Sequence, residues 1–138
     1  MRNDRRVLAV SLIASLGFVL CFGPSVGYAA RDKVKCPDLT SGGKIPAGWT
    51  HDWNLGPTGA RGWMYSDTGV TSDARQIAIT KVDTGSPADG VLQVGDVILG
   101  VRGKLFDDDP RILLGKAITV AEKASSRGLL RLMIWRKG

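Results

Sequence analysis

The feature that most constrains the fold is a pair of short apolar strands joined by a run of turn-forming residues. Gln76–Val82 is rich in β-branched side chains, which favour an extended backbone. Asp96–Val101 is a second apolar strand, and Gly95 turns the chain into it. Between the two strands, Ser86 and Pro87 are suited to cap and open a single helical turn. Short strands separated by such close turns indicate a small, β-rich unit.

The rest of the chain adds one long helix and further short strands. Asp109 followed by Pro110 is a strong helix start, and apolar side chains at helical spacing continue to about Ser125. Other strands are expected at Trp53–Leu55, Trp63–Tyr65 and Leu129–Arg136. These elements predict an α+β, mainly β, fold: five or six short strands form a partly open antiparallel barrel or sandwich, capped by one long and one short helix.

The N-terminus has the three parts of a secretory signal peptide. The first six residues include three arginines, an almost entirely apolar run follows to Phe22, and small residues precede a cleavage site after Ala29. The apolar run is shorter than the ~20 residues that span a bilayer, which favours cleavage over an uncleaved anchor helix. We therefore expect residues 1–29 to be removed and the protein to be secreted or periplasmic, with no stable membrane insertion afterwards.

The composition of the remaining chain limits its organisation and its partners. Residues 30–49 are polar and rich in glycine and proline, which predicts a flexible leader before a domain over residues 50–138. Loss of residues 1–29 removes three arginines and one aspartate, so the formal net charge falls from +6 to +4. The other basic residues are scattered, which argues against a nucleic-acid surface. Cys36 is then the single cysteine, so an internal disulfide is excluded and the fold must rest on its apolar core.

Residues 85–103 form the most specific pattern in the chain. They read GSPADGVLQVGDVILGVRG, which fits a short first helix, a turn and an apolar strand that ends at a glycine. This pattern resembles the signature of PDZ domains, especially bacterial ones, and the stretch from about Thr50 to Lys137 follows the PDZ order of elements. The stretch that begins HDWNLGPTGARGWMYSD also resembles the N-terminal part of a family of large secreted bacterial proteins that open with a PDZ domain. By that resemblance the chain is either a short member or a truncated fragment.

The resemblance implies a peptide-binding site, because PDZ domains hold the C-terminus of a partner chain between their second strand and their long helix. The loop that receives the terminal carboxylate in that family matches Ala60–Trp63, with Arg61 where an apolar residue is usual. The alternative is an ordinary loop between strands, and Arg61 either adds a charge-assisted contact or points to solvent. The implied peptide-binding residues are Arg61, Gly62, Trp63, Met64, Tyr65, Leu114, Ile118 and Ala121. For the three helical residues among them, the alternative is that they belong wholly to the core.

The sequence predicts neither an enzyme nor a metal or cofactor site. His51 is the single histidine, no nucleophile or orienting acid can be assigned to it, and it is expected on the surface. Asp107–Asp109 lack the alternating ligands of a calcium loop and more simply cap the helix that follows. We therefore expect an exported module that captures an extended peptide or a protein C-terminus by β-augmentation. The alternative is an accessory PDZ domain that recruits substrate for a larger secreted enzyme, such as a protease.

Overall fold

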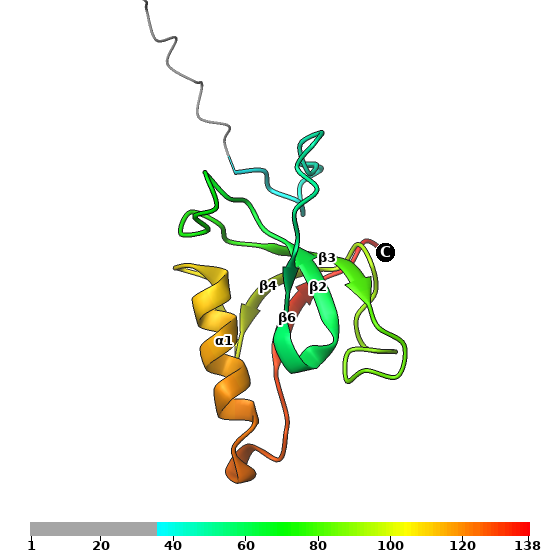
Figure 1. Ribbon diagram of the computed structural model, residues 1–138, viewed down its shortest axis with the longest axis vertical. Coiled ribbons are helices and arrows are strands. Elements are labelled where there is room, and N and C mark those ends of the chain that lie inside the picture. The colour runs from blue at the N-terminus through cyan, green and yellow to red at the C-terminus, as the bar shows by residue number, and fades with distance from the viewer. Residues whose placement is uncertain (1–35) are drawn as a thin grey trace, which may run out of the picture. The chain divides into compact units, whose positions relative to one another are not determined.

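The computed structural model describes residues 36–138, so the expected signal peptide over residues 1–29 lies outside the described residues. The described part is mainly a six-stranded antiparallel sheet, with the helix α1 (Pro110–Ala121) beside it (Figure 1). The strands are β1 (Trp53–Asn54), β2 (Ala60–Trp63), β3 (Ile77–Val82), β4 (Val97–Val101), β5 (Lys104–Leu105) and β6 (Leu132–Trp135). They lie in the order β1-β2-β3-β4-β5, and β6 pairs with β4. The fold is therefore α+β and mainly β, as the sequence predicts, with an open sheet.

β3 and β4 form the buried centre of this sheet. Ile77 pairs with Ile98 and Ala78 pairs with Val97, and all of these side chains are buried. The β-branched residues that predict the two strands thus also supply much of the core. β4 pairs in addition with β5 and β6, so it is held on both sides.

The helix α1 begins where the sequence predicts and ends earlier than predicted. The Asp109 carboxylate accepts a backbone N–H of the first turn at 2.9 Å, which is the expected N-cap. Lys123 has an extended backbone (φ −68°, ψ 143°), so the helix stops and a 3₁₀ turn, η2 (Ala124–Ser126), follows. Gly128 donates its N–H to the carbonyl of Ala121 at 3.0 Å, which closes the helix end. No helix of the described residues is long and apolar enough to cross a membrane.

The one-turn helix expected at Ser86–Asp89 is instead a series of turns. Gly85 and Gly90 flank this segment with φ values of 76° and 75°, and such a backbone interrupts a helix on either side. Leu92 donates its N–H to the carbonyl of Ala88 at 2.9 Å, and both side chains are buried. The segment therefore closes one end of the core without forming a helix.

Residues 36–49 contain no helix or strand, yet they pack on the domain. Leu39 donates its backbone N–H to the side-chain carbonyl of Gln76 at 2.8 Å. The ring of Trp49 stacks on that of Tyr65 with a centroid separation of 5.7 Å. The structure therefore places residues 36–49 in one compact unit with the sheet.

Candidate functional site

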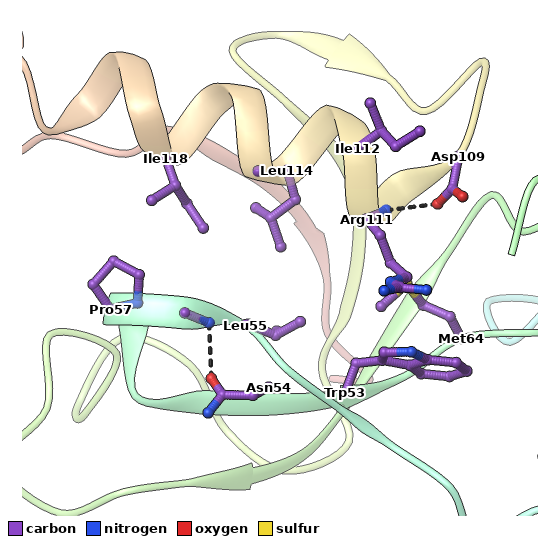
Figure 2. A pocket seen from close by; sticks show the side chains of 12 residues that line it. Trp53, Asn54, Leu55, Pro57, Met64, Asp109, Arg111, Ile112, Leu114 and Ile118 are labelled. Carbon is purple, nitrogen blue, oxygen red and sulfur yellow. Dashed lines mark hydrogen bonds between the residues drawn. The ribbon is translucent and has the colours of Figure 1, made fainter. Parts of the chain in front are cut away.

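A groove of about 640 Å³ lies between α1 and the segment that begins the sheet. One wall is formed by β1 and by the short 3₁₀ turn η1 (Gly56–Thr58) that follows it. The other wall is α1, from which Leu114 and Ile118 point toward Leu55 and Pro57 (Figure 2). We call this surface the α1 groove.

The helical wall of the groove follows from the spacing of four residues. Arg111, Leu114, Gly115 and Ile118 stand at positions i, i+3, i+4 and i+7, which places them on one face of α1. Gly115 keeps this face open, because a Cβ at that position would meet nothing within 4 Å. A larger side chain there would take up part of the groove.

The floor of the α1 groove is apolar and buried. Leu55, Met64 and Leu114 are 5%, 1% and 4% exposed and belong to the core cluster. Ile118 is half-buried, and Ile112 is 52% exposed at the rim. Leu114 therefore belongs to the core and to the groove at once. This apolar surface, which is buried at the floor and exposed at the rim, is suited to receive an apolar side chain of a ligand.

A strand edge borders the same groove. β1 is the end strand of the sheet order and pairs only with β2 among the described strands. Leu55 donates its N–H to the carbonyl of Ala60 at 3.0 Å, toward β2. Successive residues of a strand direct their backbone groups to opposite sides, so the N–H and C=O of Asn54 face away from β2. An edge of this kind can pair with an added strand.

One end of the groove carries the charged side chains of Arg111 and Asp109. The guanidinium group of Arg111 lies 5.7 Å from the centre of the Trp53 ring, within the range of a cation–π contact (Figure 2). The neighbouring Asp109 carboxylate is occupied elsewhere, because it caps α1 and accepts the Thr71 hydroxyl at 2.9 and 2.8 Å. The other end, near Pro57 and Ile118, is apolar. The groove is thus polarised along its length.

Arg61 and Gly62 lie in a strand, whereas the sequence predicts a loop at this position. Arg61 donates to the Asp52 carboxylate at 2.9 and 2.6 Å, so it neither points freely to solvent nor faces the groove. Hydrogen bonds from Arg61, and then from the Thr80 hydroxyl, hold the pKa of Asp52 below its ordinary value. Gly62 is paired with β1 on one side and β3 on the other, and a Cβ there would collide with the Ile77 side chain. Neither residue belongs to a loop whose backbone N–H groups are free to bind a terminal carboxylate.

Of the other expected site residues, Met64, Leu114 and Ile118 line the groove, and three do not. Trp63 and Tyr65 are buried at 3% and 8% exposure, and Ala121 lines pockets nearer the C-terminal end of α1. The groove residues that sequence reasoning missed are Trp53, Asn54, Leu55, Gly56, Pro57, Asp109, Arg111, Ile112 and Gly115. Helical spacing could have identified those on α1, because Arg111 stands one helical turn before Leu114 on the same face.

His51, Asp107 and Asp109 have structural partners. The ring of His51 makes an edge contact with Trp53 at a centroid distance of 4.6 Å, and His51 is exposed. Asp107 pairs with Lys104 at 2.6 Å, while Asp109 caps α1. Within residues 36–138, no three His, Cys, Asp or Glu side chains gather in a way that would hold a metal ion.

No family model matches the sequence, and no curated protein or solved structure matches it. The structure itself provides a mainly antiparallel sheet with one helix, and an apolar groove that lies between that helix and a strand edge.

Proposed function

We propose that this protein is a PDZ-like module that binds an extended peptide in the α1 groove. The observation that carries the proposal is the combination of a strand edge at Asn54 with an apolar groove whose opposite wall is a helix. An extended peptide that pairs with the edge gains main-chain hydrogen bonds, and its alternate side chains enter the groove. The N-terminal signal-peptide pattern supports a site of action outside the cytoplasm.

The sequence resemblance to PDZ domains supports the same function and needs one change of detail. The GSPADGVLQVGDVILGVRG pattern precedes the long helix in this chain, as the resemblance implies. The resemblance implies that the peptide lies beside Trp63–Tyr65, but the strand edge beside α1 belongs to β1. We therefore place the added strand beside Asn54. The proposed function requires this strand edge.

The walls of the groove indicate what kind of peptide fits. Leu55, Leu114 and Ile118 surround a space that favours one apolar side chain, since burial of apolar surface contributes roughly 25 cal/mol per Å². Arg111 at the other end favours a carboxylate, whether a side chain or a chain terminus. The best ligand is thus an extended peptide that carries an apolar residue and an acidic group within a few residues of it.

The proposal is tested by comparing two lysine substitutions, one inside the groove and one outside it. Ile118→Lys places a charge in the groove, whereas Val94→Lys places one at a 68% exposed position that does not line it. Titration of a labelled peptide library should give affinities on the order of micromolar for the wild type and for Val94→Lys. Ile118→Lys should bind at least about 10-fold more weakly while its circular dichroism spectrum stays that of the wild type. Equal binding by the two folded variants would refute the assignment of the groove.

A further inference from the structure

A second pocket, of about 550 Å³, lies beside the C-terminal half of α1. It is bounded by the turn at Arg102–Gly103 and by the segment that runs from Ser125 to Arg131. Its α1 side chains are Ala117, Val120 and Ala121, which do not line the α1 groove. The two pockets therefore use different residues of the same helix.

The arginines of this second pocket differ from every other arginine that the structure describes. Arg61 and Arg136 are paired with carboxylates, Arg75 donates to backbone carbonyls, and Arg111 lies over an aromatic ring. The side chains of the remaining described arginines have no hydrogen-bond or ion-pair partner, and all of them line this pocket: Arg102, Arg127 and Arg131. The arginines without a protein partner among the described residues thus all line one pocket.

The backbone conformation fixes the Cα positions of these arginines. Arg102 and Arg127 have φ values of 54° and 52°, a left-handed conformation that is uncommon outside glycine. Each is followed by a glycine with positive φ, so each stands in a tight turn. The N–H of Arg102 donates to the carbonyl of Arg131 at 2.9 Å, which ties one wall of the pocket to the other. The three Cα positions are therefore held by the fold rather than by the side chains.

We propose that this pocket binds a ligand that carries a phosphate group. An anion in this pocket would meet three arginines that have no protein partner among the described residues, and each guanidinium group matches two oxygens of a phosphate. A phosphate monoester carries nearly two negative charges and three acceptor oxygens, which suits several arginines better than one carboxylate does. The hydroxyls of Ser125 and Ser126 add hydrogen-bond donors at the same pocket. Leu129, which is 67% exposed, adds an apolar rim that an acyl chain or an aromatic group of the ligand would cover.

The test compares two triple variants of the full chain that lose the same positive charge. The pocket variant is Arg102→Asn, Arg127→Asn and Arg131→Gln, since asparagine tolerates the left-handed backbone. The control variant is Lys44→Gln, Lys116→Gln and Lys137→Gln, whose exposed lysines do not line this pocket. One arm titrates inorganic phosphate by NMR; the other uses phosphatidylcholine vesicles with and without phosphatidic acid, so that a soluble source is distinguished from a lipid headgroup.

We expect saturable binding in at least one arm, weakened about 10-fold or more in the pocket variant and little changed in the control. In the vesicle arm, the binding that counts is the part that depends on phosphatidic acid. No binding in either arm, or an equal loss in the two variants, would overturn the proposal. Peptide binding at the α1 groove should be the same in both variants, so failure of one proposal is distinguishable from failure of the other.

Discussion

The guanidinium group of Arg136 donates to both carboxylate oxygens of Asp96, at 2.7 and 2.6 Å. Asp96 is 2% exposed, and its carboxylate also accepts the N–H of Gln93 at 2.8 Å. Arg136 reaches further to the carbonyl of Val91 at 3.0 Å. Because Asp96 stands just before β4 and Arg136 just after β6, the pair joins the end of the chain to the turn that starts the central strand.

Removal of the Asp96 carboxylate should destabilise the fold. Asp96→Ala deletes charge-assisted hydrogen bonds at a buried position, so we expect the free energy of unfolding to fall by about 2 kcal/mol. Urea denaturation followed by tryptophan fluorescence measures the change. Asp73→Ala removes an exposed carboxylate for which no side-chain partner is found among the described residues, and should have little effect. A loss as large in Asp73→Ala would show that the Asp96 pair has no special role.

The same pair predicts a dependence of stability on pH. The hydrogen bonds from Arg136 hold the pKa of Asp96 below its ordinary value of 3.8. The unfolded chain then takes up this proton at a higher pH than the folded chain, so the contribution is fully present above pH 3.8 and is lost as pH falls through the folded-state pKa. The wild type should lose stability more steeply than Asp96→Ala below about pH 4. Urea midpoints between pH 7 and pH 2 test this, and parallel curves would contradict it.

Two glycine substitutions should change stability in opposite directions. A Cβ at Gly100 would collide with the backbone carbonyl of Lys104, so Gly100→Ala must separate β4 from β5 and should cost about 2–3 kcal/mol. Gly115 lies inside α1 with nothing near its Cβ position, so Gly115→Ala should stabilise by about 0.5–1 kcal/mol. Thermal melting of both variants gives the signs. A neutral Gly100→Ala would contradict the close approach of the two strands.

Arg111 should set the charge preference of the α1 groove. Arg111→Glu reverses the charge of the side chain at that end of the groove, while a glutamate in the first helical turn is compatible with α1. Peptides with an acidic group should bind this variant about 10-fold more weakly than the wild type at low salt, with a smaller difference at high salt. Lys116→Glu makes the same change on α1 outside the groove and serves as the control. Equal effects of the two reversals would show that Arg111 acts only through the net charge of the protein.

Some elements could be predicted because local chemistry alone decides them. β3 and β4 follow from runs of β-branched residues, and α1 follows from Asp109 and Pro110 at its start. β2 could not be placed from its own sequence, because Ala60–Trp63 includes a glycine and an arginine and reads as a loop. It is a strand because β1 and β3 pair with it on both sides, which is a property of the whole sheet.

The candidate site was only partly predictable for the same reason. Leu114 and Ile118 follow from helical spacing, but Leu114 is buried enough to serve the core as well, so a substitution there tests the fold rather than binding. Asn54 and Pro57 have no pattern that marks them as a wall of the groove. Their role depends on β1 being the end strand of the sheet beside α1, and that arrangement comes from long-range pairing.

We propose that a peptide adds as a strand beside Asn54. The backbone N–H of Asn54 faces away from β2, whereas the N–H of Leu55 is already bonded to Ala60 at 3.0 Å. Hydrogen exchange of these two amides, measured by NMR with and without a saturating peptide, reports whether Asn54 pairs with the peptide. Exchange at Asn54 should slow markedly on binding, while exchange at Leu55 should change little. An unchanged rate at Asn54, with slowing instead at Met64 or Tyr65, would rule out strand addition at Asn54.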